Sequence, residues 1–322
     1  MSDLPKSIRI NEEGPREGFQ FEKGPIATAR KIELIDSLSK TGLKQIQTVS
    51  FVPPQNVPGM ADCVEVVRGF TPHPGVSYTG LWLNERGLQR AIDTGKLDIK
   101  GALYLCASEA FLQRNQKRTF EENLAAQHAL AVLYQQRQIA VESCGIMAAF
   151  GCNFEGDVPI ARVLTLLRQL LDIDAQYGLG LQSIVLADTM AWATPLSIKR
   201  VVGAVRDQFP HLRVGLHLHD TRGMGIANAC AGLEMGVDLF DAAVAGLGGC
   251  PFAAHGGAAG NVCTEDFVFM CHEMGIETGI DLDLLIESAL LAEQIVGHAL
   301  PGCIMKGGSL ARLRKERLRR QP

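Results

Sequence analysis

Short runs of apolar and β-branched residues alternate along the chain with longer segments in which apolar residues recur every three or four positions. The short runs are typical of strands and the longer segments are typical of amphipathic helices. Eight of the short runs predict strands, at residues 8–12, 44–51, 76–83, 99–108, 139–150, 181–188, 212–220 and 239–249. Helical spacing is clearest in four segments between them, at residues 27–40, 121–137, 159–177 and 194–209. This alternation predicts a parallel sheet with helices packed on its outside.

We therefore expect an α/β protein with a single (β/α)8 TIM barrel, because no Gly/Ser-rich linker divides the 322 residues. The alternative is a doubly wound open sheet, which a glycine-rich phosphate loop after the first strand would favour. The segment after that strand, "GPREGFQ" at residues 14–20, is not such a loop.

The chain after the last predicted strand carries an extra helical pattern at residues 281–300. We expect residues 1–300 to form the catalytic barrel domain, including this extra helix, and residues 301–322 to form a basic tail. The tail can be a solvated helix, or a contact for a polyanionic ligand or a neighbouring subunit. The extra helix favours a homodimer.

Composition narrows the class of protein. Hydrophobic residues make up 47% and charged residues 20% of the chain, which is ordinary for a soluble globular enzyme. The formal net charge of -4 gives no electrostatic reason to expect nucleic acid as a partner. No apolar signal segment and no run of about 18 apolar residues is present, so we expect a cytoplasmic protein without a membrane partner. The nine cysteines include no CxxC pair, and we interpret them as reduced thiols, most of them in the core.

The seventh predicted strand ends in "HLHD", which places two histidines two positions apart. His217 and His219 therefore project to the same face of an extended strand. At the carboxyl end of a barrel strand that face lies beside the substrate, and two imidazoles there favour a divalent-metal site. Hydrogen-bonded core histidines are the alternative. We expect Asp220 to orient an imidazole or to cap the following helix.

Two other strand ends carry residues that complete such a site. Glu17 follows the first strand and can supply an oxygen ligand, and Arg16 can stabilise an oxygen that becomes negative. The glycine-rich segment 245–266 predicts a loop that closes over a ligand, and it contains Cys250 and Asn261. The amide oxygen of Asn261 suits Mg²⁺ or Mn²⁺ better than zinc. A surface ion pair and a flexible surface turn are the corresponding alternatives.

These segments together resemble the 3-hydroxy-3-methylglutaryl-CoA lyase family, within the wider metal-dependent lyase and synthase barrels. The resemblance extends from about Ile8 to about Pro301. Its strongest stretches are "GPREGFQFEKG", "TVSFVPPQNVPGMADCVEV", "ASEAFLQRN", "HLHDTRGMGIANA", "GLEMGVDLFDAAVAGLGGCPF" and "GNVCTEDFVFM".

The resemblance implies retro-Claisen cleavage of a 3-hydroxyacyl-CoA, with 3-hydroxy-3-methylglutaryl-CoA giving acetyl-CoA and acetoacetate as the default. Mg²⁺ or Mn²⁺ would be held by Glu17, His217, His219 and Asn261. Arg16 would stabilise the enolate oxygen, His217 would remove the hydroxyl proton, and Cys250 would take part in proton transfer. The implied substrate contacts are Gln20, Lys23, Gln47, Ser50, Asn84 and Thr189.

The chain departs from the family pattern at several positions near the pocket. Glu17 stands where the family has aspartate, and Gln47 stands where it has glutamate. Ser143 replaces an arginine, Val185 replaces a serine, and Trp192 lies in a stretch that is normally small. These changes suggest an acyl group that is bulkier or less anionic. The alternatives are a lyase for citramalyl-CoA or a branched homologue, a Claisen-type synthase, and a catalytically weakened binding protein.

Overall fold

A computed structural model describes residues 4–22, 24–249 and 259–319 of the chain. Its centre is an eight-stranded parallel sheet with the order β3-β2-β1-β10-β9-β8-β5-β4. The strands are β1 (Arg9–Glu12), β2 (Gln45–Ser50), β3 (Ser77–Leu81), β4 (Gly101–Cys106), β5 (Val141–Met147), β8 (Ser183–Ala187), β9 (Arg213–His217) and β10 (Leu239–Ala242). All eight lie within the segments that the hydrophobic pattern predicts.

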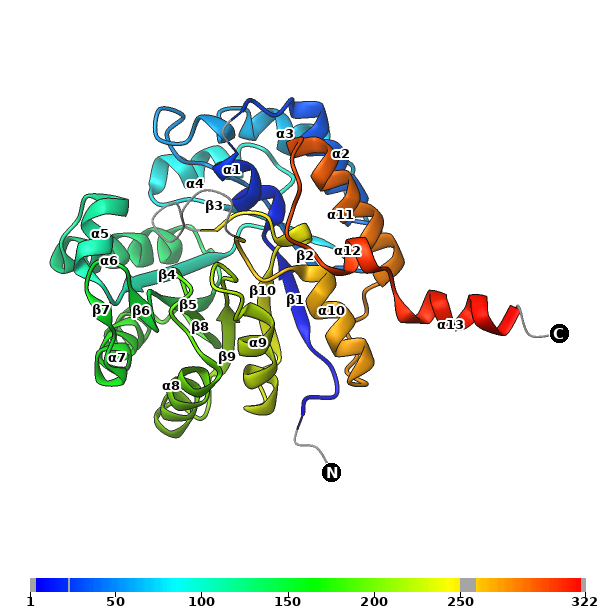
Figure 1. Ribbon diagram of the computed structural model, residues 1–322. Coiled ribbons are helices and arrows are strands. Elements are labelled where there is room, and N and C mark those ends of the chain that lie inside the picture. The colour runs from blue at the N-terminus through cyan, green and yellow to red at the C-terminus, as the bar shows by residue number, and fades with distance from the viewer. Residues whose placement is uncertain (1–3, 23, 250–258, 320–322) are drawn as a thin grey trace.

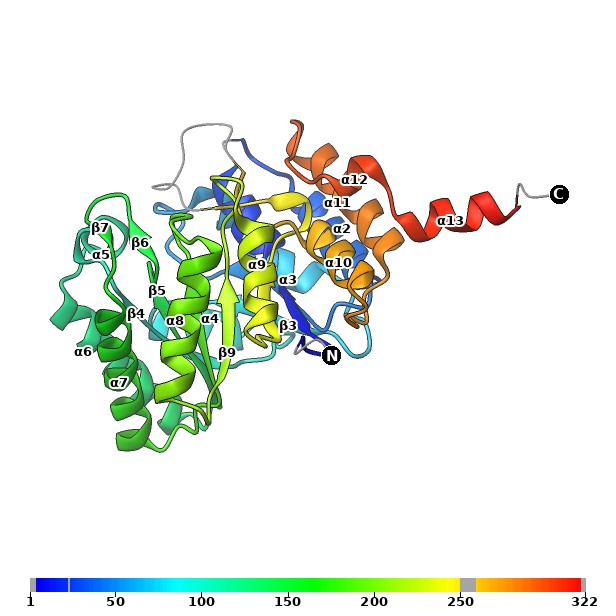
Figure 2. The same cartoon turned by 60° about the horizontal axis from the view of Figure 1, so that its bottom comes forward.

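Helices stand around the outside of the strands and form the outer layer of the barrel (Figures 1 and 2). A short antiparallel hairpin, β6 (Gly151–Cys152) with β7 (Gly156–Asp157), follows β5. The helices are α1 (Phe19–Phe21), α2 (Thr28–Leu38), α3 (Cys63–Gly69), α4 (Glu85–Ile92), α5 (Glu109–Gln116), α6 (Phe120–Gln136), α7 (Ile160–Tyr177), α8 (Pro195–Gln208), α9 (Gly225–Glu234), α10 (Thr264–Glu273), α11 (Leu282–Val296), α12 (Ile304–Gly307) and α13 (Leu310–Arg319). Among the described helices, none has the length and apolar character needed to cross a membrane.

Along the chain, β1 is the first strand of this sheet and β10 is the last, and the two pair with each other in parallel. This pairing curls the sheet into a barrel and excludes the doubly wound alternative, so the prediction of a (β/α)8 barrel is confirmed. The junction between β3 and β4 is weaker than the others. No ladder joins these two described strands, and one backbone hydrogen bond, from Asp98 N to Tyr78 O at 2.8 Å, links the two segments. The amide of Tyr104 in β4 donates instead to the side chain of Gln127, at 3.0 Å.

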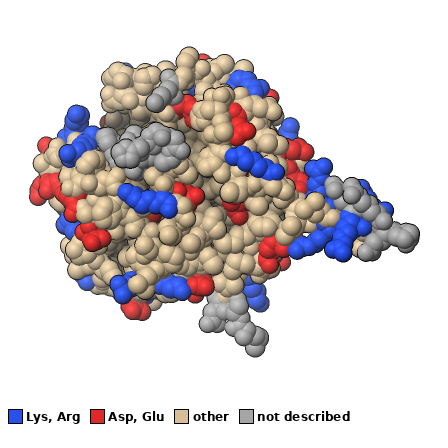
Figure 3. Space-filling model, in the orientation of Figure 1, with Lys and Arg blue, Asp and Glu red and all other residues tan. Residues whose placement is uncertain are grey.

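The extra C-terminal helix is α11, which packs beside α2 and α10. The basic tail is also helical: α13 extends away from the barrel in both ribbon views, and its Lys and Arg side chains form a positive surface (Figure 3). Arg314 anchors its middle through two contacts of 2.8 Å with the carboxylate of Glu273.

A buried carboxylate ties together the carboxyl ends of the first and last strands. Glu12, at the end of β1, accepts hydrogen bonds from the amides of Gly14 and Val244, both at 2.8 Å, and from the hydroxyl of Thr264 at 2.7 Å. Burial raises the pKa of this carboxyl to about 8, because desolvation outweighs the three hydrogen bonds that favour the charged form.

The raised pKa predicts how stability depends on pH. An unfolded glutamate releases its proton near pH 4.5 and folded Glu12 near pH 8, so the contribution of Glu12 to stability falls as pH rises through this window. Glu12→Gln keeps the shape and the acceptor oxygen but cannot ionise. Calorimetry gives the difference in melting temperature between the variant and the wild type. We expect this difference, variant minus wild type, to be larger at pH 8 than at pH 5. Other carboxyls titrate in both proteins and cancel, so an equal difference at the two pH values would contradict this prediction.

Candidate active site

The segment after β1 is a five-residue π-helical turn, η1 (Gly14–Gly18), with Pro15 in its first turn. Its two glycines permit close packing on both sides. A Cβ at Gly14 would lie 2.6 Å from a carboxylate oxygen of Glu12, and one at Gly18 would lie 2.8 Å from the side chain of Leu247. The two glycines therefore let the turn pack closely against the barrel. In this position Arg16 and Glu17, which lie between the glycines, point into the mouth of the barrel.

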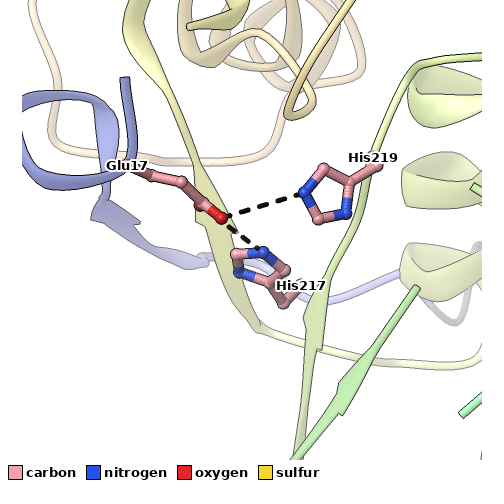
Figure 4. Close-up of side chains that lie close together, drawn as sticks. All are labelled: Glu17, His217 and His219. Atoms are coloured by element: carbon pink, nitrogen blue, oxygen red, sulfur yellow. Dashed lines mark ion pairs between the residues drawn. The ribbon is translucent and has the colours of Figure 1, made fainter. Parts of the chain in front are cut away.

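The turn brings Glu17 next to the two histidines of β9 and the residues after it (Figure 4). One Glu17 carboxylate oxygen lies 3.7 Å from His217 Nε2, and the other lies 3.9 Å from His219 Nε2. One ligand atom from each residue falls within 4.8 Å of the others, and Glu17 and His219 are buried. Both imidazoles point to the same place, as the spacing of the histidines predicts.

Hydrogen bonds on the far side of each ring hold the histidines in this orientation. His217 Nδ1 lies 3.2 Å from a carboxylate oxygen of Asp241 in β10, and His219 Nδ1 donates to the backbone carbonyl of Asp188 at 2.8 Å. A carbonyl oxygen only accepts, so neutral His219 carries its proton on Nδ1 and directs the lone pair of Nε2 toward Glu17. That nitrogen is buried and has no hydrogen-bond partner among the described residues. An unpaired nitrogen lone pair facing a carboxylate is the donor arrangement that a divalent cation fits.

The cluster perturbs the acidity of its members. Burial opposes ionisation of Glu17, but the charges of Arg16, His217 and His219 outweigh it and lower the pKa of the carboxyl to about 2. Burial and the neighbouring His217 lower the pKa of His219 to about 4. Burial also lowers the pKa of His217. The carboxylates of Glu17 and Asp241 outweigh this effect and raise its pKa to about 9.

Arg16 is held between one amide and two carboxylates. Its Nε donates to the side-chain oxygen of Gln47, and its Nη2 lies 2.6 Å from a carboxylate oxygen of Glu13. Its Nη1 lies 3.8 Å from Glu17, which is too far for a hydrogen bond. The guanidinium therefore lies beside the Glu17–histidine cluster.

A cavity of about 380 Å³ occupies the barrel interior below this cluster. Glu13, Gln47 and Asp241 line it, together with Ser143 and Val185, two of the positions where the sequence departs from the expected pattern. Trp192 does not line the cavity.

Comparison with known proteins places this geometry in a family. The sequence profile of the HMGL-like family matches residues 7–291. The chain belongs to the HMGL-like family. It is 38% identical over 288 residues to human mitochondrial hydroxymethylglutaryl-CoA lyase, covering 89% of this chain and 85% of that protein. A hydroxymethylglutaryl-CoA lyase of Bacillus subtilis is 37% identical over 299 residues, covering 92% and 96%.

Two solved structures of HMGL-like enzymes show the same architecture. The HMG-CoA lyase of Bacillus subtilis superimposes with a TM-score of 0.87 at 35% identity, covering 95% of this chain and 99% of that one. An HMG-CoA lyase of Acinetobacter baumannii in complex with coenzyme A and 3-methylmalate superimposes with a TM-score of 0.85 at 36% identity, covering 96% and 98%. The sequence-based predictions of the family and of a lyase on a TIM barrel are confirmed.

Other candidate residues of this HMGL-like protein lie at several places around the mouth. Asn261 donates its amide to Glu17 at 3.0 Å, so it joins the cluster. Gln20 and Ser50 contact each other, with 3.4 Å between their side-chain oxygens. Asn84 caps the first turn of α4, and Thr189 accepts a hydrogen bond from the amide of Ala148. Their roles toward substrate stay predictions. Two further candidates, Lys23 and Cys250, lie outside the described residues.

Sequence reasoning missed two acids of the site, Glu13 and Asp241. Glu13 precedes Arg16 by three residues, a spacing at which side chains on a helical turn meet. Asp241 is a charged residue inside an apolar strand, and the β10–β9 register places it opposite His217. Both signals are visible in the sequence. Asp220, in contrast, contacts neither ring, because its carboxylate accepts the amide of Gly225 at the start of α9.

The ligand set can be tested by metal binding alone. We expect Glu17→Gln to weaken Mn²⁺ binding by about tenfold or more in calorimetric titration, because an amide cannot supply the negative charge. Asp241→Asn should weaken it by roughly tenfold to a hundredfold through the orientation of His217. Glu33→Gln changes a surface acid on α2 and serves as the control. Wild-type affinity in Glu17→Gln would exclude this carboxylate as a ligand.

Proposed function

We propose that this protein is a divalent-metal-dependent carbon–carbon lyase that cleaves 3-hydroxy-3-methylglutaryl-CoA to acetyl-CoA and acetoacetate. The observation that carries the proposal is the convergence of Glu17, His217 and His219 beside the guanidinium of Arg16. Membership of the HMGL-like family and similarity to hydroxymethylglutaryl-CoA lyases over about nine-tenths of the chain support the same reaction.

The candidate donor set mixes oxygen and nitrogen. Glu17 offers oxygen and the histidines offer nitrogen. The amide nitrogen of Asn261 faces Glu17, so Asn261 would supply its oxygen to a cation only after the amide turns over. With that turn, the donors would comprise two oxygens and two nitrogens, a set that Mn²⁺ or Mg²⁺ can accept. When bound, such a cation supplies Lewis acidity that lowers the pKa of the substrate hydroxyl.

His217 is the base in this proposal. Without a cation, the carboxylates of Glu17 and Asp241 raise the pKa of His217 and favour its protonated form. A cation held by Glu17 would offset that charge and leave Nε2 free to take the proton of the C3 hydroxyl, and Asp241, 3.2 Å from Nδ1, would stabilise the imidazolium that forms. A nitrogen that takes up a proton cannot hold a metal at the same moment. The ligand and base roles of His217 therefore exclude each other in any one state. Glu17, His219 and Asn261 would hold the cation while His217 carries the proton.

Arg16 stabilises the charge that develops as the bond breaks. Loss of the hydroxyl proton forms the C3 carbonyl, the C2–C3 bond breaks, and its electron pair moves into the enolate of the departing acetyl-CoA. The guanidinium beside the cluster offers N–H groups to the enolate oxygen. Protonation at C2 then completes acetyl-CoA, and Cys250 is the group we propose for that step.

The decisive experiment is turnover of a substrate panel. The purified protein is incubated with Mn²⁺ or Mg²⁺ and with 3-hydroxy-3-methylglutaryl-CoA, citramalyl-CoA and branched 3-hydroxyacyl-CoAs, and acetyl-CoA release is followed by chromatography. We expect the highest kcat/KM with 3-hydroxy-3-methylglutaryl-CoA. A higher value for another member would reassign the substrate, and metal binding without any turnover would favour a binding protein.

The role of Arg16 predicts a specific loss. Arg16→Gln should lower kcat by about a hundredfold to a thousandfold, the range found when one donor to a developing oxyanion is removed. Steady-state kinetics at saturating Mn²⁺ measure the effect, and Arg30→Gln, on the outer surface of α2, is the matched control. A change confined to KM would show that Arg16 binds the substrate without stabilising the transition state.

A further inference from the structure

The side chain of Arg16 is 13% exposed and that of Glu13 is 6% exposed. A buried charge is stable only when it is paired, because removing an ion from water is costly. Of the three groups around Arg16, Gln47 is neutral, and Glu17 is a member of the Glu17–histidine cluster at 3.8 Å. Glu13, at 2.6 Å, is therefore the described carboxylate that pairs with Arg16 directly.

We propose that Glu13 is the positioning residue of Arg16: it neutralises the guanidinium and fixes the direction of the N–H groups that face the substrate. The proposal rests on the function proposed above, in which Arg16 stabilises the enolate oxygen. It assigns to Glu13 the counter-charge that Gln47 cannot supply.

The donor inventory of arginine shows how the positioning works. A guanidinium has five N–H donors in one plane. Gln47 accepts a hydrogen bond from Nε, and Glu13 accepts one from Nη2. These two donors lie on one edge of the guanidinium plane, so the two partners together set its orientation. The remaining donors, including both on Nη1, make no hydrogen bond to a described residue, and Nη1 lies on the side of Glu17. Those donors are available to a substrate oxygen beside the cluster.

The backbone of Glu13 has a separate role, which makes side-chain substitution a clean test. Its amide donates to the carbonyl of Ala242 at 2.8 Å, and its carbonyl accepts the amide of Glu17 at 2.8 Å. These bonds join η1 to β10 whatever the side chain is. Glu13→Gln therefore removes the charge while it keeps the turn and the approximate shape.

The test exchanges the charge between the two partners of Arg16. We expect Glu13→Gln to lower kcat by roughly tenfold or more, with a smaller change in KM, since misdirected donors chiefly affect the transition state. Adding Gln47→Glu to this variant restores a carboxylate on the Nε side and should recover kcat to within about threefold of wild type. Unchanged kcat in Glu13→Gln, or no recovery in the double variant, would overturn the proposal.

Two measurements separate positioning from general damage. Glu265→Gln removes another buried carboxylate, one that contacts the amide of Ala245 and not Arg16, and Gln47→Glu should not rescue it. Mn²⁺ affinity of Glu13→Gln should stay within about threefold of wild type. A large loss of affinity would assign Glu13 to the metal site instead and overturn the positioning role.

Thermal unfolding tests the pair even if no acyl-CoA is cleaved. In the Arg16→Gln background, Glu13→Gln should shift the melting temperature by several degrees less than it does in the wild type, because contacting residues are not additive. Additive shifts would overturn the pairing. A coupled melting temperature without turnover of any substrate would instead retain the pair and reject the proposed function.

Discussion

The parallel pairing of β1 with β10 is the interaction on which the rest of the structure depends. Four residue pairs, from Arg9 with Leu239 to Glu12 with Ala242, join the beginning of the described chain to a strand some 230 positions later. Glu17 and His217 become neighbours only because this pairing exists. The buried carboxylate of Glu12 lies at the upper end of the same pairing and bonds to both sides of it. The same strand pairing thus both shapes the barrel and brings the residues of the candidate site together.

The electrostatics of the mouth follow from burying many ionisable groups in a small volume. Arg16, Glu13, Glu17, His217 and Asp241 form a continuous chain of charge contacts. Each acid faces at least one positively charged or basic group. These groups outweigh burial at Glu17, whereas burial prevails over Arg16 at Glu13 and raises the pKa of that carboxyl to about 7. His219 is the exception: burial and the neighbouring His217 lower its pKa to about 4, and its Nε2 has no hydrogen-bond partner in the part of the chain that the structure describes. Its environment is that of a ligand nitrogen, which distinguishes its chemistry from that of His217.

Much of the fold could be predicted from the sequence, because strand and helix periods alternate cleanly and each strand lies in a predicted run. Strand geometry alone predicts that His217 and His219 point to the same face. Their closeness to Glu17 follows because the carboxyl ends of parallel strands lie at one edge of the sheet. The partners that hold these residues were harder to predict. Glu13 and Asp241 act through side-chain directions that depend on the π-helical turn and on strand register. Trp192 packs on Gly151 and hydrogen-bonds Asn153, and it is not among the residues that line the cavity, so its effect on the choice of acyl group stays a prediction.

The weak junction between β3 and β4 has a mechanical consequence for the barrel. A ring of strands that is uniformly bonded spreads any distortion over all its members, whereas a ring with one weak joint concentrates distortion at that joint. In the strand order, the point farthest from this joint is the β10–β9 pair. His217 lies on that pair, and Glu17 follows the neighbouring strand β1. The candidate site therefore lies opposite the weak joint, whereas the wall of the cavity near Thr79 and Tyr104 lies beside it, on the side of the barrel that can deform more easily.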